Sequence, residues 1–226
     1  KRLINEPSAA ALYYSQSRAQ SECRLLVIDF GGGTLDVSVV DCFENMVEIV
    51  AIAGNNHLGG NDIDQAIAEY FCSQTGLVWS TLGPQQQRQL LALAERGKIA
   101  LSSAGDRGCM LACEIGPELY SVPLDSHILS EICQPVFQKV REVIVRAVRD
   151  SEIPISAIQD VVLVGGSSQL GVFVDYLEEL FSRRPTLAEH PEHTVALGVG
   201  MYAGIKQRDE DLREIVMTDV CPFSLG

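Results

Sequence analysis

Residues 27–41 read VIDFGGGTLDVSVVD and place three consecutive glycines between two apolar runs. A flexible linker is rarely bounded on both sides by alternating β-branched residues, so this pattern predicts a turn between two strands. Residues 46–53, MVEIVAIA, continue as a third strand after a short turn around Glu44 and Asn45. The stretch therefore predicts three adjacent antiparallel strands, with Asp29 before the glycines and Asp36 after them.

The glycine turn is a candidate anion site, because backbone N–H groups without a neighbouring Cβ can approach an anion closely. The sequence has neither a GxxxxGK[ST] loop nor a correctly spaced dinucleotide fingerprint. A second unit, VGGSS at 164–168, follows an apolar strand and precedes a helix, whose N-terminus favours anions. GGGT alone fits a tight hairpin as well as an anion site. Two such turns facing each other could grip one nucleotide.

The two flanking aspartates, Asp29 and Asp36, can likewise be either structural residues or part of an anion site. Carboxylates at the ends of strands are often only solvated turn residues. Beside a phosphate-binding turn, they are electrostatically favourable when a divalent cation or an attacking water lies between them.

Helical patterns occupy much of the remaining chain. Helices are expected near Pro7, from a cap at Asp62 to about residue 74, over 84–101 and over 193–208. Two helices are expected between residues 125 and 151, with Pro135 starting the second. The elements from 60 to 151 are expected to form an insertion between two halves of one α/β core.

Composition narrows the possible partners. The chain has 226 residues and a formal charge of −13, which repels phosphate backbones and anionic lipid surfaces, so no nucleic-acid or membrane partner is expected. Its seven cysteines lack the paired CxxC spacing of zinc or redox sites and indicate reduced thiols in a cytoplasmic protein. No apolar run reaches the length of a membrane span, and no signal sequence opens the chain.

Other candidate sites are weaker. His190 and His193 are separated by Pro191, which disfavours a helical two-histidine metal site. GGSSQ lacks the second glycine of a nucleophile elbow, so a serine hydrolase is not expected. Glu142 and Arg146 are expected to form a solvated i,i+4 pair.

Six ordered motifs across the whole chain resemble the nucleotide-binding domain of the 70-kDa heat-shock chaperones: INEPSAAAL, IDFGGGTLDVSV, AGNNHLGGNDID, AERGKIALSS, DVVLVGGSSQL and DVCPFSLG. The chain is similar to the second lobe (lobe II) of that domain. The resemblance implies an actin-like, ribonuclease-H-like α/β fold with a mixed sheet. It implies a core subdomain at 1–57 plus 155–208, an inserted α+β subdomain at 58–154, and an interdomain linker and the start of the substrate-binding domain at 209–226. The glutamine in GGSSQL and the tail TDVCPFSLG are more similar to the bacterial HscC-type branch than to the housekeeping chaperones.

The resemblance also implies roles for individual residues. Asp29 would hold the magnesium hydration shell or position the attacking water, with Glu6 and Asp36 beside it as catalytic residues. The β- and γ-phosphates would contact Gly31, Gly32, Gly33 and Thr34, and Gly60 would lie by the ribose and phosphates. The adenosine would contact Glu95, Lys98 and Ser102 on one side and Gly165, Gly166, Ser167 and Gln169 on the other.

This sequence departs from the family pattern at the adenine end. Ile99 and Gln169 replace two arginines that would sandwich the base, and stacking on arginine contributes roughly 1 kcal/mol. Asn61 stands where the family has an acidic residue, Gly171 where it has proline, and Glu192 where it has aspartate. None of these changes removes a phosphate-binding group.

The implied function is that of an ATP-driven chaperone that binds Mg²⁺ with ATP or ADP and couples hydrolysis to capture and release of unfolded polypeptide. Its partners would be apolar peptide segments held by a downstream domain, a J-domain co-chaperone and a nucleotide exchange factor. Because the family's other phosphate turn and catalytic lysine belong upstream of Lys1, this chain alone is not expected to turn over ATP. The alternatives are a small-molecule kinase and a non-enzymatic filament-forming or regulatory protein on the same fold.

Overall fold

The three strands expected around the glycine turn are present and antiparallel. β1 (Cys23–Phe30) pairs with β2 (Leu35–Phe43), and β2 pairs with β3 (Met46–Asn55). The computed structural model describes residues 4–17, 23–43, 46–104, 108–207 and 216–218. The glycines at 31–33 lie in the turn between β1 and β2, as predicted.

In the described part of the chain the larger sheet has six strands in the order β7-β6-β1-β2-β3-β8. β6 (Asp160–Val164) runs parallel to β1, and β7 (Thr186–Leu187) runs parallel to β6. At the other edge β8 (Val216–Thr218) runs parallel to β3. The sheet is therefore mixed, and it places β6, with the second glycine motif at its end, directly beside β1.

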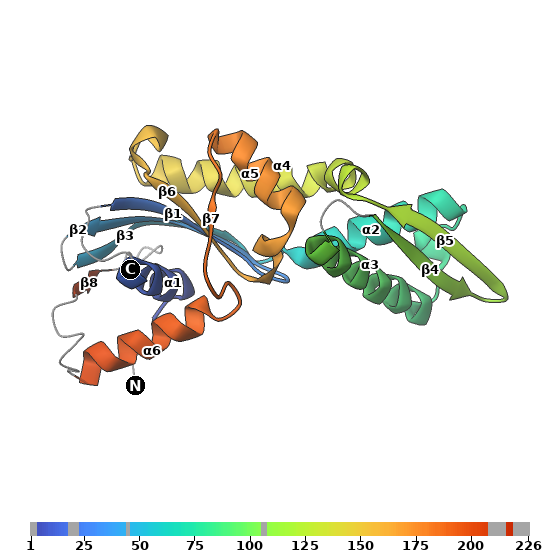
Figure 1. The fold of residues 1–226 in the computed structure, drawn as a ribbon, viewed down its shortest axis with the longest axis horizontal. Helices are drawn as coiled ribbons and strands as arrows, with labels where there is room; N and C mark the ends of the chain where they lie inside the picture. The colour runs from blue at the N-terminus through green and yellow to red at the C-terminus, as the bar shows by residue number, and fades with distance from the viewer. Residues whose placement is uncertain (1–3, 18–22, 44–45, 105–107, 208–215, 219–226) are drawn as a thin grey trace, which may run out of the picture.

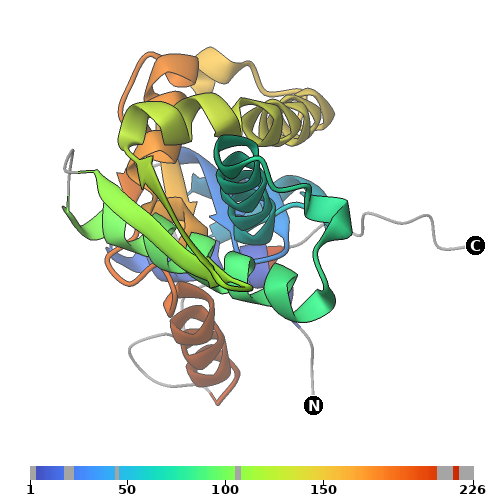
Figure 2. The ribbon, with the colours of Figure 1, turned by 90° about the vertical axis from the view of Figure 1, so that its right-hand side faces the viewer.

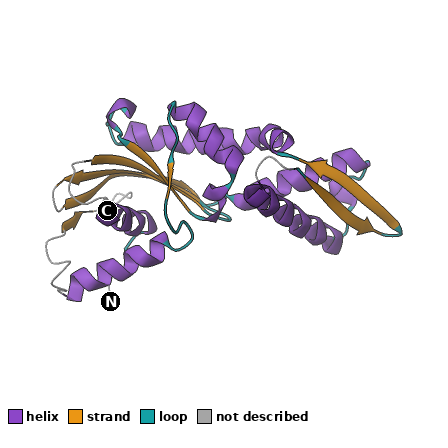
Figure 3. Cartoon of the chain, in the orientation of Figure 1, coloured by secondary structure: helices purple, strands orange, loops and turns teal. Residues whose placement is uncertain are grey.

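Helices cover both faces of this sheet (Figure 1; Figure 3). α1 (Glu6–Ser17) and α6 (Thr194–Gln207) lie on one side, and α4 (Ser126–Asp150) and α5 (Gly171–Phe181) lie on the other. Alternate residues of β2 point to different faces. Val37 and Val39 pack in the core on the α4 side, whereas Val40 and Cys42 pack in the core on the α1 side.

A second group of elements extends from the core. It contains α2 (Gly60–Thr75), η1 (Trp79–Thr81), α3 (Pro84–Ala104) and a two-stranded sheet of β4 (Cys109–Ile115) and β5 (Glu118–Leu124). Figure 2 views the molecule with this group in front of the larger sheet. The apolar stripe expected on α3 is buried: Leu90, Ala94, Gly97 and Leu101. Gly97 allows β4 to approach, because a Cβ there would lie 2.5 Å from Leu111 Cδ2.

The expectation of two helices between residues 125 and 151 is wrong. α4 is one helix with Pro135 inside it, and Asp125 caps its start by accepting a hydrogen bond from the Ile128 N–H at 2.8 Å. An internal proline removes one backbone hydrogen bond. The helix continues because its apolar face is buried on both sides of the proline, from Leu129 to Ala147.

α4 also bears on the domain division. It packs against β2, β3 and α5 as well as against α2. The boundary at residue 154 stays a prediction, but α4, which precedes it, covers the larger sheet. The remaining short elements are η2 (Ile155–Ala157) and η3 (Gly166–Gln169). None of the helices over the described ranges is long and apolar enough to cross a membrane.

Candidate functional site

The glycine turn is held by hydrogen bonds to two segments far away in the sequence. The Gly31 carbonyl accepts from the Gly60 N–H at 2.9 Å and from Ser167 Oγ at 2.8 Å. The Asn61 N–H donates to the Gly32 carbonyl at 2.7 Å. The start of α2 and the second glycine motif therefore both dock on the turn, so the structure brings the two predicted glycine turns together.

Close approach of backbones explains the glycines around this junction. A Cβ on Gly59 would lie 2.5 Å from the Gly33 nitrogen. Gly165 has φ +85° and a Cβ there would lie 2.5 Å from the Phe30 carbonyl oxygen, so both conformation and space require glycine. Gly32 differs, because nothing lies within 4 Å of its Cβ position. Its N–H and that of Gly33 have no protein acceptor within the described ranges.

The start of α2 differs from the predicted one. The helix begins at Gly60, and Asp62 is its third residue, whose Oδ2 accepts the Gly59 N–H at 2.8 Å. Asp62 therefore caps the helix from inside. The Gly60 N–H donates to the Gly31 carbonyl, so this hydrogen bond orients the glycine turn.

Three carboxylates predicted to be catalytic lie together beside the turn. Asp29 and Asp36 are directly opposite in the β1–β2 register, and Glu6 is in the first turn of α1. Burial, then Asp36, then Glu6 raise the pKa of Asp29 to about 6. Burial and the Glu6 charge likewise raise the pKa of Asp36. A cation near this cluster would favour the ionised forms.

A cavity of about 350 Å³ opens on the other side of the turn. Seven of the predicted binding residues line it: Gly32, Glu95, Lys98, Ser102, Gly166, Ser167 and Gln169. Its other lining residues are Asn61, Asp64, Ile99, Leu170 and Glu192. The remaining predicted residues are outside this lining, in the turn, at the start of α2, in the carboxylate cluster or just before Gly166: Glu6, Asp29, Gly31, Gly33, Thr34, Asp36, Gly60 and Gly165.

Lys98 makes contacts that the sequence did not indicate. Its Nζ lies 2.7 Å from Asp64 Oδ1 and donates to the Gly60 carbonyl at 3.0 Å, with both side chains largely buried. Burial raises the pKa of Asp64, and Lys98 opposes this rise. Asp64 was not among the residues predicted for the site. A usable signal was its place four residues after Gly60, which puts both on one face of α2.

The far end of the cavity carries the departures from the family pattern. Gln169 Nε2 donates to Glu192 Oε1 at 3.2 Å, and Ile99 is 56% exposed. Ser102 Oγ donates to the Lys98 carbonyl at 3.1 Å, so its hydroxyl proton is directed to its own helix. This end therefore presents an apolar side chain and carboxylate and amide oxygens.

Among the described residues, no three His, Cys, Asp or Glu side chains are close enough to hold a metal ion together. A metal bound only through water would not need such a set. The assignment of Asp29 as a ligand through water stays a prediction.

Comparisons with known proteins give a consistent result. The family model described as "Hsp70 protein" matches residues 1–226. The chain is 34% identical over 235 residues to the chaperone protein DnaK of Thermosipho melanesiensis, covering 100% of this chain and 39% of the relative. It is 33% identical over 232 residues to the chloroplastic heat shock 70 kDa protein 7 of Arabidopsis thaliana, covering 100% of this chain and 32% of the relative. It therefore spans about two fifths or less of these relatives. With a mixed α/β sheet consistent with the actin-like ATPase fold and a family match over its whole length, the chain belongs to the Hsp70 family.

Proposed function

We propose that this chain is the second lobe of the nucleotide-binding domain of an Hsp70-type chaperone and binds ATP or ADP with Mg²⁺. The observation that carries the proposal is the junction of the two glycine turns between the carboxylate cluster and the 350 Å³ cavity. In the intact protein, ATP binding and hydrolysis would drive capture and release of unfolded polypeptide by a downstream domain. A J-domain co-chaperone, a nucleotide exchange factor and a cytoplasmic location belong to the same proposal.

The phosphates would bind the exposed side of the turn. Gly32 has open space at its Cβ position, and the N–H groups of Gly32 and Gly33 have no acceptor in the described part of the protein. Unpaired backbone N–H groups in a glycine turn suit phosphate oxygens. Gly31 and Gly60 would act indirectly, because their hydrogen bond fixes the shape of the turn.

Mg²⁺ would lie beside Asp29, held through water, and would neutralise charge on the phosphates. Asp29, Asp36 and Glu6 fit such an ion because ionising Asp29 is unfavourable without a positive charge nearby. Below about pH 6 Asp29 holds a proton; above it, the carboxylate can accept a hydrogen bond from an ordered water.

The ribose and base would occupy the cavity. Lys98 would contribute mainly by holding α3 against α2 through Asp64, while Glu95 and Glu192 offer acceptors to hydroxyl and amino groups. Ile99 replaces stacking by apolar contact, so we expect weaker adenine binding than with the arginine pair. Placement in the HscC-type branch stays a prediction.

The same proposal covers the division of the chain. Residues 1–57 and 155–208 would form the core, and the part inserted after residue 57 would form the second subdomain. The packing of α4 on β2 and β3 favours assigning this helix to the core. The segment 209–226 would be the interdomain linker and the start of the substrate-binding domain, and β8 would couple nucleotide state to that domain through its pairing with Met46, Val47 and Glu48.

Calorimetric titration with ADP and Mg²⁺ tests the proposal. Gly32→Ala adds a Cβ on the exposed side of the turn without an internal clash, so it should fold normally and weaken binding at least tenfold. Gly200→Ala is the matched control, because its Cβ position on α6 is also open. No ADP binding at millimolar concentration, or equal affinity in both variants, would count against the proposal. Phosphorylation of a small molecule by the intact protein would instead favour the kinase alternative.

A further inference from the structure

Two cysteines face each other at the end of the larger sheet remote from the glycine turn. Cys23 is the first residue of β1, and it is directly opposite Cys42 of β2 in the antiparallel register. Residues opposite each other on antiparallel strands have Cα atoms about 4.5 or 5.5 Å apart, within the range of about 4.4–6.8 Å that a disulfide spans. Their side chains also project to the same face.

The two side chains belong to the same apolar cluster on the α1 side of the sheet. Burial first, then the Cys23 thiol through charge and hydrogen bonding, raises the pKa of Cys42 to about 12. Both cysteines are free thiols in the structure. The sulfur atoms therefore need no rearrangement of the strands to meet.

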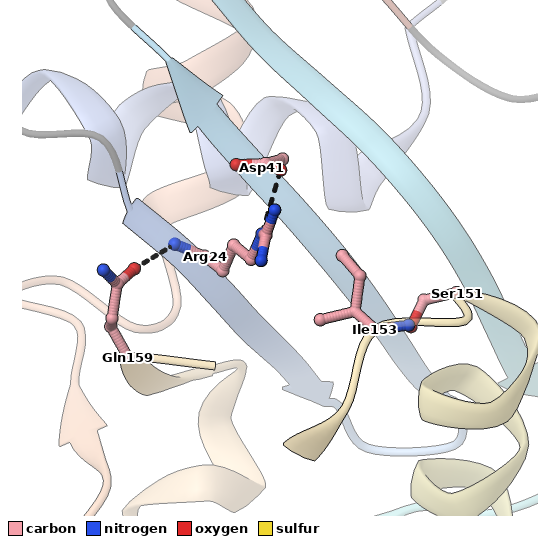
Figure 4. Close-up of polar contacts among 5 residues, drawn as sticks. All are labelled: Arg24, Asp41, Ser151, Ile153 and Gln159. Atoms are coloured by element: carbon pink, nitrogen blue, oxygen red, sulfur yellow. Dashed lines mark hydrogen bonds and ion pairs between the residues drawn. The ribbon is translucent and has the colours of Figure 1, made fainter. Parts of the chain in front are cut away.

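Neighbouring contacts hold the two strand ends together (Figure 4). In the next register position, Arg24 Nε donates to Asp41 Oδ2 at 3.1 Å. The Arg24 N–H donates to Gln159 Oε1, which ties β1 to the segment before β6. Ser151 Oγ accepts the Ile153 N–H at 3.1 Å and shapes the chain that leads there. The cysteine pair is thus held in a fixed frame.

The two cysteines differ in their exposure. Cys23 is half-buried at the start of β1. Cys42 is 7% exposed. A small, uncharged oxidant such as hydrogen peroxide therefore reaches Cys23 first.

We propose that Cys23 and Cys42 form an oxidation site that closes to a cross-strand disulfide on reaction with hydrogen peroxide. The Cys23 thiolate attacks the peroxide O–O bond, keeps one oxygen as a sulfenic acid and releases the other as hydroxide. The Cys42 sulfur then attacks the Cys23 sulfur, an S–S bond forms, the S–O bond breaks and the departing hydroxide takes the Cys42 proton. Two thiols are oxidised and one peroxide is reduced to two waters.

This site is separate from the proposed nucleotide site, because the length of β1 puts Cys23 roughly 23 Å from Phe30, beside the turn. No other cysteines face each other in strand register within the described residues. Cys109 and Cys113 lie four residues apart on one strand, roughly 13 Å, beyond the span of a disulfide.

Peptide mapping after treatment with one equivalent of peroxide tests the proposal. We expect a loss of two hydrogen atoms per chain, reversed by dithiothreitol, and one cross-linked peptide pair containing Cys23 and Cys42. The oxidised chain should unfold about 5 °C higher, because the loop between the cysteines is closed. The high pKa of Cys42 makes the second step slow at neutral pH, so the rate of closure should rise from pH 7 to pH 9.

Single variants separate the two steps. Cys42→Ser should stop the reaction at a Cys23 sulfenic acid that dimedone traps, and Cys23→Ser should abolish both products. Cys109→Ser, which changes another half-buried thiol, should leave the disulfide yield unchanged. A disulfide linking other cysteines, or overoxidation of Cys23 without cross-linking in the wild type, would overturn the proposal.

Discussion

Replacing Asp29 by asparagine should raise the free energy of unfolding by about 3 kcal/mol at pH 7 but by only about 0.5 kcal/mol at pH 4. Burial, Asp36 and Glu6 raise the pKa of Asp29 from 3.8 to about 6. The folded chain therefore holds this proton up to about pH 6, whereas the unfolded chain releases it near pH 4. The contribution of the protonated carboxyl is complete below the unfolded pKa and is lost as pH rises through about 6.

The size of the effect follows from the pKa difference of about 2 between the folded and unfolded states, at about 1.4 kcal/mol per pKa unit. Asparagine has nearly the same shape and no charge, so it removes the penalty without leaving a cavity. Urea unfolding followed by far-ultraviolet circular dichroism from pH 4 to pH 7.5 measures the difference. Asp175→Asn, on the exposed face of α5, is the control and should show no comparable rise.

A stability difference between wild type and Asp29→Asn that stays constant within about 0.5 kcal/mol over this range would refute the reasoning. The cause can be tested further with Asp36→Asn. Because the Asp36 charge is the second contribution to the raised pKa of Asp29, this variant should lower that pKa, as measured by carboxyl-carbon NMR titration.

Three further predictions concern contacts that hold the site. Lys98→Met should destabilise the fold by about 3 kcal/mol in urea because it leaves Asp64 buried and unpaired, and adding Asp64→Leu should restore at least half of the loss. Gly165→Ala should lower stability by at least about 3 kcal/mol, whereas Gly76→Ala, also at positive φ but with open space, should lower it by about 1 kcal/mol; equal losses would contradict the steric argument. Arg146→Gln should speed hydrogen exchange at residues 55–59 about tenfold, and Arg141→Gln should not, because only Arg146 donates to the carbonyl at the end of β3, at 2.6 Å.

The Arg146 contact also corrects an expectation. The predicted ion pair with Glu142 is not among the contacts within the described ranges, because the guanidinium donates to Gly54 instead. An i,i+4 pair in water contributes only a few tenths of a kcal/mol, so a fixed backbone carbonyl on a neighbouring strand can replace it.

The sequence by itself determined the strands around the glycine turns, the buried face of α3 and the position of the turns themselves. Alternation in LDVSVV and the unbroken apolar run VVLV are local patterns, and each produced the strand that it predicted. The spacing of Leu90, Ala94, Gly97 and Leu101 likewise identified the buried face of α3. Such patterns are readable because the period of side chains along a strand or helix decides which of them can be buried together.

Only the tertiary structure decided which groups meet. The Gly31 carbonyl accepts hydrogen bonds from the Gly60 N–H and from Ser167 Oγ, which is 136 positions away in the sequence. Lys98 pairs with Asp64. Pro135 was expected to start a helix and instead lies within one, because burial of the whole face of α4 outweighs one missing hydrogen bond. Each of these outcomes depends on a partner far away in the chain. Hydrogen bonds between distant segments do not produce a periodic pattern in the local sequence, so they cannot be predicted from it.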